Sequence, residues 1–212
     1  MKKILFILFL ALTSKIALSQ TILDTSKPYV NGDKLSYKLK TSGNGKNLKV
    51  EINFVEVGEN LWRGLVVREN KIFQVSASAY GTVANDVCLG NGQKCDFDPP
   101  IKLFDKNIKI NDQWVNKFKV TGEDFSSNSI QEVKVEKQEK IKLDIGEFEA
   151  FKIVTKSKFE GSTIKNDKFS GTDISELWVG NIKEKLVLLK VKYNNSFKEY
   201  WNLELDSLPH SN

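Results

Sequence analysis

Apolar and charged residues alternate along most of this chain, and the alternation is longest between residues 139 and 159. Every second residue is apolar just before Gly146, and the same period resumes after it at Phe151 and Ile153. A two-residue period is typical of a β-strand with one buried face. Glycine tolerates the positive φ that a tight turn demands. The segment therefore predicts a long hairpin that folds back at Gly146.

The same period predicts strands over much of the remaining chain. In the segment 113–121, for example, Trp114 and Phe118 share one face with other alternate residues. Between residues 81 and 100 the alternation weakens, and two adjacent prolines argue against a central strand because proline cannot donate to a ladder. The first strand of the Gly146 hairpin is expected to begin early, as one long strand over 130–145. The other expected strands are 35–39, 48–54, 61–67, 71–79, 113–121, 172–179, 185–193 and 197–205.

No amphipathic helix of useful length follows the N-terminal segment, and no repeat of fixed period stands out. Roughly ten or more strands joined by polar loops indicate an antiparallel sheet that curves strongly. We therefore expect an all-β fold with few or no helices after the N-terminal segment of residues 1–19. The sheet is expected to be a single curved antiparallel sheet, either a half-barrel or an open β-barrel. Residues 20–212 are expected to form this single β domain.

Residues 1–19 have the pattern of a signal peptide. Lys2 and Lys3 precede an unbroken apolar run from Ile4 to Leu12, and small residues end the segment. The run is much shorter than the roughly 20 residues that a membrane-spanning helix needs. No cysteine stands at the end of this segment, so the pattern does not favour a lipoprotein anchor. We predict cleavage between Ser19 and Gln20 and a periplasmic location, with an extracellular location as the alternative.

The net charge of +5 falls once this segment is removed. Without Lys2, Lys3 and Lys15, 29 basic residues face 27 acidic ones, which leaves a net charge of +2. Nearly all of the basic residues are lysines, whereas bidentate recognition of phosphates and bases favours arginine. This balance does not favour a nucleic-acid partner, and by itself it does not indicate an anionic membrane surface.

Cys88 and Cys95 enclose a six-residue segment that contains Gly90 and Gly92. In an oxidising compartment the first interpretation is a disulfide. Closing such a ring would stabilise the fold by roughly 2.5 kcal/mol in the chain-entropy model. The alternatives are a redox-active pair or half of a metal site, but the spacing and the scarcity of other ligands favour neither.

Residues with catalytic chemistry are scarce in this sequence. The single histidine, His210, lies close to the C-terminus, so a Ser-His-Asp arrangement of the usual form cannot be assembled elsewhere. No phosphate-binding loop or dinucleotide fingerprint occurs. We expect no catalytic residue, no cofactor and no metal. Two alternatives stay open: a calcium site at Asp86, Asp96 and Asp98, whose spacing does not match an EF-hand, and a hydrolase that uses paired carboxylates.

Aromatic residues within the expected strands are the most suggestive feature. The first interpretation is that they fill the core of the sheet. The second is that some of them line a cavity for an acyl chain or another apolar ligand on the concave face. The candidate ligand-binding residues are Trp62, Phe73, Trp114, Phe118 and Trp178.

The segment Ile141–Ile153 consists of a strand, a short glycine turn, a phenylalanine and an apolar strand. Asp112-Gln113-Trp114 precedes it and Glu176-Leu177-Trp178-Val179 follows it. In this order of elements, residues 30–206 resemble a family of bacterial periplasmic proteins of unknown function, related to TapB-like pilus accessory proteins. That family shares a half-barrel architecture with the lipoprotein carriers LolA and LolB. The resemblance implies a half-barrel and carries over no catalytic residues, and the turn at residues 180–183 and the cysteine loop depart from the family's pattern.

Two functions are consistent with these observations. Our first hypothesis is an exported, non-enzymatic periplasmic protein that binds an apolar or lipid-like ligand on the concave face of its sheet. The alternative is a structural or assembly accessory of the cell envelope that binds another protein and carries no small ligand. Neither hypothesis involves nucleic acid or a membrane-spanning segment.

Overall fold

The structure is a computed structural model that describes residues 23–24, 30–42, 44–57, 62–68, 71–77, 82–88, 93–103, 107–183 and 185–210. Within these residues the chain forms fourteen strands and no helix. The strands are β1 (Leu23–Asp24), β2 (Lys34–Thr41), β3 (Asn44–Val57), β4 (Trp62–Arg68), β5 (Lys71–Ala77), β6 (Thr82–Cys88), β7 (Gln93–Lys102), β8 (Asn107–Ile108), β9 (Gln113–Thr121), β10 (Phe125–Leu143), β11 (Gly146–Thr163), β12 (Lys168–Ile182), β13 (Lys185–Asn195) and β14 (Tyr200–His210).

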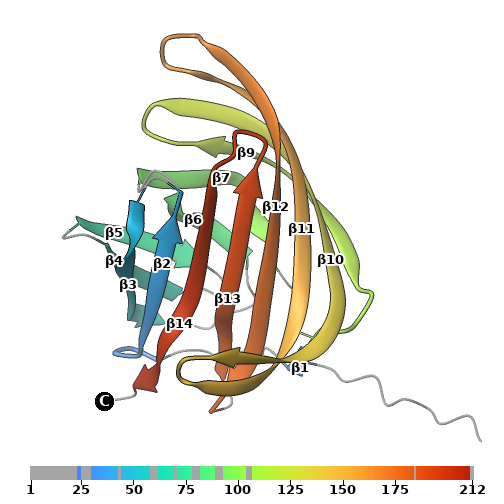
Figure 1. The fold of residues 1–212 in the computed structure, drawn as a ribbon. Coiled ribbons are helices and arrows are strands. Elements are labelled where there is room, and N and C mark those ends of the chain that lie inside the picture. Colours follow the sequence, from blue (N-terminus) through green and yellow to red (C-terminus); the bar gives the residue numbers. More distant parts are fainter. Residues whose placement is uncertain are drawn as a thin grey trace, which may run out of the picture.

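Twelve of these strands form one antiparallel sheet that closes into a barrel (Figure 1). Their order is β10, β11, β12, β13, β14, β2, β3, β4, β5, β6, β7 and β9, and β9 also pairs with β10. The prediction of an all-β fold with one curved antiparallel sheet is confirmed. The sheet has no open side, because β7 pairs with β9 over residues 96–98. Closure removes the unpaired backbone groups that a free sheet edge would expose.

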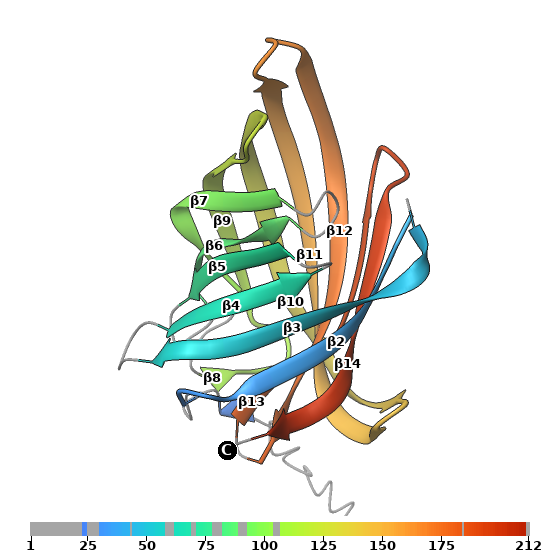
Figure 2. The same ribbon diagram turned by 90° about the vertical axis from the view of Figure 1, so that its left-hand side faces the viewer.

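The barrel has a tall wall and a short wall. Strands β10, β11 and β12 contain 19, 18 and 15 residues, whereas β4, β5 and β6 contain 7 residues each. Since a strand rises about 3.3 Å per residue, the long strands extend well beyond the short ones. Figure 2 shows them standing above the short wall. We call this end, where β10 begins at Phe125, the upper end, and the end with the Gly146 turn the lower end.

Strands β6 and β7 occupy the segment in which the sequence pattern argued against a central strand, so that expectation was wrong. Pro99 and Pro100 belong to β7, which lies between β6 and β9. Pairing with β9 ends at Asp98, and pairing with β6 breaks between Asp96 and Ile101. The prolines therefore lie at an irregularity of the ladder, where no hydrogen-bond donor is needed from them.

Apolar side chains fill the lower half of the barrel. Buried and exposed residues alternate along the strands, as in β2, because successive side chains point to opposite faces. Ile108 of β8 is also fully buried, and the nearby Asn111 donates a backbone hydrogen bond to Val135 of β10 at 2.8 Å. The largest fully buried side chains are Tyr37, Phe54, Leu39, Ile108, Ile153, Leu189, Leu205, Val135, Val179, Val187 and Asp33.

Asp33 is the charged member of that buried set, and it joins the start of β2 to the start of β13. Its carboxylate forms an ion pair with Lys185. The backbone N–H of Val30 donates a hydrogen bond to the same carboxylate oxygen at 2.7 Å. A buried carboxylate without partners would be costly, so these contacts fix how the chain enters β2.

The hairpin of β10 and β11 turns at Gly146, as predicted, with a φ of 140°. At the lower end the hairpin bends across the outside of the neighbouring strands (Figure 1). Lys38 of β2 donates a hydrogen bond from Nζ to Asp144 at 2.9 Å, although β12, β13 and β14 separate β2 from β11 in the sheet. This hydrogen bond lowers the pKa of Asp144. The turn of the hairpin therefore reaches over three strands.

This arrangement predicts different responses to the same substitution at two isoleucines. Ile153 of β11 is 1% exposed inside the barrel, and Ile174 of β12 is 40% exposed. Ile153→Ala should lower the free energy of unfolding by about 2–5 kcal/mol because it leaves a cavity in the core. Ile174→Ala should lower it by less than about 1 kcal/mol. Urea denaturation measures both, and equal losses would contradict the assignment of inward and outward faces.

Candidate functional site

Above the apolar core, the inward side of the long strands changes character. Beyond Ile153, every second residue of β11 continues the inward face, since side chains alternate along a strand. The ladder places the inward residues of β10 and β12 beside them. We call this set the upper inner wall; it consists of Phe125, Ser127, Ser129 and Gln131 of β10, Thr155, Ser157, Phe159 and Gly161 of β11, Phe169, Gly171, Asp173 and Ser175 of β12, and Tyr193 of β13.

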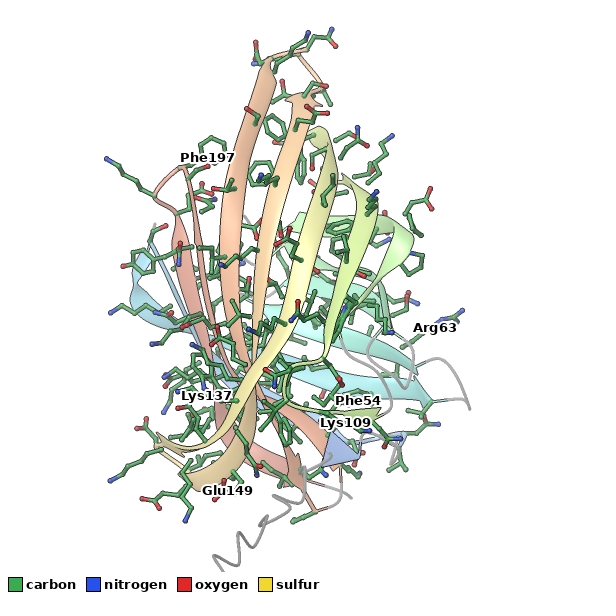
Figure 3. The ribbon with its side chains drawn as sticks, turned by 90° about the vertical axis from the view of Figure 1, so that its right-hand side faces the viewer. Phe54, Arg63, Lys109, Lys137, Glu149 and Phe197 are labelled. Atoms are coloured by element: carbon green, nitrogen blue, oxygen red, sulfur yellow. The ribbon has the colours of Figure 1, made fainter. Side chains whose placement is uncertain are left out.

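Four phenylalanine rings form a continuous row near the upper end. The ring centroids of Phe125 and Phe169 are 6.3 Å apart, and those of Phe169 and Phe159 are also 6.3 Å apart. Phe197, in the turn between β13 and β14, lies 5.9 Å from Phe159 and is 51% exposed (Figure 3). The other three rings are half-buried. This phenylalanine row therefore presents an apolar surface to solvent.

Two glycines lie opposite rings of this row. Gly161 pairs with Phe169 across the ladder, and Gly171 pairs with Phe159. A Cβ atom added at Gly171 would lie 2.7 Å from Cζ of Phe159, and one at Gly161 would lie 2.8 Å from Cζ of Phe169. Each ring thus covers the facing glycine, which compensates for the missing side chain in the sheet. The glycines let the rings lie close to the wall.

A polar group lies directly below the phenylalanine row. Asp173 faces Ser157 across the ladder of β11 and β12. Burial raises the pKa of the Asp173 carboxyl, and a hydrogen bond with Ser157 opposes this rise without cancelling it. Burial also raises the pKa of Tyr193 to about 12, and the charge of Asp173 adds to that rise. A carboxyl held where its charge is disfavoured is more frequent at functional sites than elsewhere.

Thr155 lies one inward position closer to the core than Ser157. Its Oγ1 atom is buried and has no hydrogen-bond partner among the described residues. A buried hydroxyl without a partner costs free energy, and native proteins satisfy most such groups. Thr155 pairs with Ser175, which stands next to Asp173 on the inward face of β12. The wall therefore combines unused hydrogen-bonding capacity with a half-buried carboxyl.

The aromatic surface continues from this polar group toward β14. Tyr193 stacks on Trp201 with a centroid distance of 5.2 Å and an interplanar angle of 13°. Trp201 pairs in turn with Thr41 at the upper end of β2. The inner wall thus carries aromatic rings on both sides of Asp173.

Three of the candidate ligand-binding residues belong to β4, β5 and β9 and are not part of the upper inner wall. Phe73 of β5 packs against the apolar core. Trp114 of β9 also packs against the core, and its indole N–H donates to the carbonyl oxygen of Lys102 at 2.8 Å. Trp62 belongs to β4, but its side chain lies outside the described residues. The structure therefore uses Phe73 and Trp114 as packing residues.

Phe118 is the candidate that joins the upper inner wall. It faces inward from β9, pairs with Ser129 and meets the ring of Phe97 edge-on at 5.9 Å. It thus brings an aromatic ring to the edge of the wall formed by β10.

Trp178 lies on the outer face of the barrel, where it is buried, with 7% of its surface exposed. The ladder pairs it with Lys152, which stands between two buried inward residues of β11. Its indole N–H donates to Glu139 Oε1 at 2.9 Å, and the ammonium groups of Lys152 and Lys192 lie 5.6 and 5.7 Å from its ring. Trp178 is therefore not part of the upper inner wall, because the strand turns this side chain outward.

The two cysteines lie on adjacent antiparallel strands. Cys95 of β7 is fully buried and pairs with Asp86 of β6, and Cys88 of β6 pairs with Gln93. Cys88 and Cys95 thus occupy the same face of this hairpin, one diagonal step apart. The side chain of Cys88 lies outside the described residues, as do Ser19 and Gln20, so both the disulfide and the cleavage site stay predictions.

Sequence reasoning missed the phenylalanine row and Asp173. A signal for the row was present, because Phe159-Glu160-Gly161 and Phe169-Ser170-Gly171 repeat the same spacing on either side of one hairpin turn. In an antiparallel pair, this spacing can set each phenylalanine opposite the other glycine. No comparable signal marks Asp173, because its importance comes from burial beside β11 and β13.

Other chemistry is limited in the part of the chain that the structure describes. No group of three or more histidine, cysteine or acidic residues within it could hold a metal ion. Asp96 forms an ion pair with Lys94 at 3.0 Å, and the side chain of Asp86 is not described. His210 pairs with Lys34 at the lower end of the barrel, away from the upper inner wall. None of the described residues belongs to a helix long and apolar enough to span a membrane.

These observations define a closed antiparallel β-barrel with an apolar lower half and an aromatic and polar upper inner wall. A solved structure shares this fold. The chain is similar to a presumed lipoprotein from Parabacteroides distasonis, with 11% sequence identity and a TM-score of 0.53 over 86% of this chain and 97% of that chain. At this identity the similarity shows the fold alone.

Two further structures resemble the chain more weakly. A presumed exported protein with a YmcC-like fold from Bacteroides fragilis has 10% identity and a TM-score of 0.44, over 87% of this chain and 98% of that chain. The hypothetical lipoprotein YmcC from Escherichia coli has 9% identity and a TM-score of 0.40, over 85% and 87%. No family model and no curated protein matches the chain, so the resemblance to TapB-like proteins and to LolA and LolB stays a prediction.

The raised pKa of Asp173 predicts a pH-dependent stability. An ionised Asp173 costs the folded state free energy, so the wild type loses stability as pH rises from the ordinary aspartate pKa of about 3.9 through the raised value. Asp173→Asn removes this loss and should raise the free energy of unfolding at neutral pH, with no gain below about pH 3.9. Urea denaturation across this pH range measures the difference. If Asp173→Asn were less stable than the wild type at neutral pH, the result would contradict a cost of ionised Asp173 in the folded state.

The disulfide between Cys88 and Cys95 predicts a simple mass measurement. Alkylation of the unfolded protein without reductant should leave its mass unchanged, since a bridge protects both sulfurs. Alkylation after reduction should add two labels. Two labels in the unreduced protein would rule the bridge out.

Proposed function

We propose that this chain is an exported, non-enzymatic binding protein that holds an amphipathic, lipid-like ligand against its upper inner wall. The phenylalanine row is the observation that carries this proposal. Its rings stand on the concave face, remain partly exposed and are supported by Gly161 and Gly171. Rings placed only to fill a core would be covered, as Ile153 and Leu189 are.

The polar group beneath the row supports an amphipathic rather than a purely apolar ligand. An acyl chain could lie along the rings of Phe159 and Phe169, where burial of apolar surface favours binding. The head of the same molecule could then hydrogen-bond with Thr155, Ser157 and Asp173. Sites of this kind combine a mainly apolar surface with a few placed polar groups that fix orientation.

The position of the chain's single histidine favours binding over catalysis. His210 lies at the lower end, so nucleophilic catalysis of the Ser-His type is not available on the upper inner wall. The predicted signal peptide supports an envelope or extracellular location. The presumed lipoprotein from Parabacteroides distasonis, which shares the fold, is consistent with that location.

Displacement of a fluorescent apolar dye tests the proposal. N-phenylnaphthylamine should brighten on binding to the protein purified from its own envelope, and long-chain amphiphiles should displace it. Removal of two apolar rings in Phe159→Ala/Phe169→Ala should weaken dye binding by about ten-fold or more. Ile174→Ala, which deletes apolar surface from the outer side of β12, should leave binding unchanged.

Either of two results would contradict the proposal. One is a native mass spectrum without any bound species together with no dye binding. The other is dye binding that the double phenylalanine variant and Ile174→Ala reduce equally. Circular dichroism of both variants controls for unfolding.

A second function, binding of an envelope protein, is favoured by the hairpin tips at the upper end. Ile164 in the turn of β11 and β12 is 73% exposed, and Phe197 in the turn of β13 and β14 is 51% exposed. Apolar side chains that form one exposed patch mark sites of protein contact. A stoichiometric envelope partner that the wild type retains and Ile164→Ser loses, in a protein that binds no dye, would favour this alternative.

A further inference from the structure

The outer face of the tall wall carries a group of lysines around an exposed isoleucine. Ile130 of β10 pairs with Lys117 of β9 on one side and with Lys158 of β11 on the other. In the neighbouring rows, the outer face adds Lys119, Lys134 and Lys156, and all five lysines are exposed. We call Lys117, Lys119, Lys134, Lys156 and Lys158 the outer lysine face. This side of the barrel faces the viewer in Figure 3.

The lysines of the outer lysine face outnumber the acidic groups around them. In the described part of the chain, no ion pair joins any of its five lysines to a carboxylate. Glu132 stands within the face, Glu160 lies at its upper border and Asp98 of β7 pairs with Lys119, so five lysines face three acidic residues there. Lower on the same wall the situation differs, because Lys152 forms ion pairs with Glu136, at 3.3 Å, and with Glu176. The positive charge is therefore concentrated in the upper part.

Apolar side chains are exposed among these lysines. Ile130 is 50% exposed, and Val115 of β9, one row lower, is 56% exposed. Ile174 of β12 pairs with Lys156 and is also exposed. Exposed apolar side chains thus lie among the lysines on four adjacent strands.

We infer that the outer lysine face docks on the surface of an anionic lipid bilayer. Lysines near such a surface gain electrostatic attraction, and each contributes roughly five-fold to binding. Apolar side chains between them can enter the boundary between headgroups and acyl chains. A soluble polyanion would satisfy the lysines but would leave Ile130 and Val115 in water, so the combination favours a bilayer. The small net charge of the chain does not oppose this, because attraction depends on local charge within a Debye length of about 8 Å.

Co-sedimentation with vesicles tests this inference. The mature protein should bind vesicles of phosphatidylcholine with about 30% phosphatidylglycerol, and should not bind pure phosphatidylcholine. Lys117→Gln/Lys158→Gln should lower the partition coefficient by about ten-fold or more, and about 0.5 M salt should have a comparable effect. The matched control, Lys142→Gln/Lys183→Gln, removes the same charge at the lower end and should leave binding unchanged.

Ile130→Asn separates a bilayer from a soluble polyanion. This variant should lower vesicle binding by about three-fold, because it removes apolar surface that enters the interface. It should not change binding to polyglutamate, which offers charge without an apolar layer. Equal loss in the two lysine double variants, or an unaffected Ile130→Asn variant that binds polyglutamate as well as vesicles, would overturn the inference. Dye binding to the upper inner wall should survive all of these substitutions, so the outcome is independent of the proposed function.

Discussion

The backbone ladder between β10 and β11 is the interaction on which the other features depend. It runs from the pair Phe125–Thr163 to the pair Leu143–Gly146, far longer than any ladder of the short wall. The part of this ladder that rises above the short wall contributes most of the upper inner wall. At the lower end, the ladder carries Asp144 across the outside to Lys38. One bulge, between Val135 and Lys137, separates these parts, and a bulge bends a strand and increases its twist.

Because side chains alternate, each long strand has an inner and an outer face. The kinds of side chain on the two faces change at the same height along the barrel. Inside, the fully buried Ile153 is followed by hydroxyl groups and then by the phenylalanine row. Outside, the paired charges around Lys152 are followed by the lysines of the outer lysine face. Since both changes occur on the same strands, the two surfaces lie back to back on one wall. A ligand inside and a membrane outside would therefore be separated only by the thickness of a single sheet.

Much of the fold could be predicted from the sequence, because alternation and a glycine turn are local signals. The hairpin at Gly146, the strand Gln113–Thr121 and the curved antiparallel sheet follow from them. Closure could not be predicted, because it depends on a few pairs between β7 and β9 that no local pattern marks. The two prolines of β7 argued against a central strand, and that prediction was wrong. The irregular pairing with β6 and β9 that accommodates them is not marked by a local pattern either. Alternation also cannot tell inward from outward, so the sequence could not place Trp178 on the outer face.

Two side chains of the upper inner wall cost the folded protein free energy, and this is the strongest reason to regard the wall as functional. Asp173 is held where burial disfavours its charge, and Thr155 buries a hydroxyl without a partner in the described chain. An alanine or valine at either position would avoid these costs, as Val191 and Leu203 do one layer lower. Sites that break local rules of stability are concentrated where a protein binds something. Both costs would fall if a bound polar group hydrogen-bonded to the wall, and this is the stabilisation that the proposed ligand would supply.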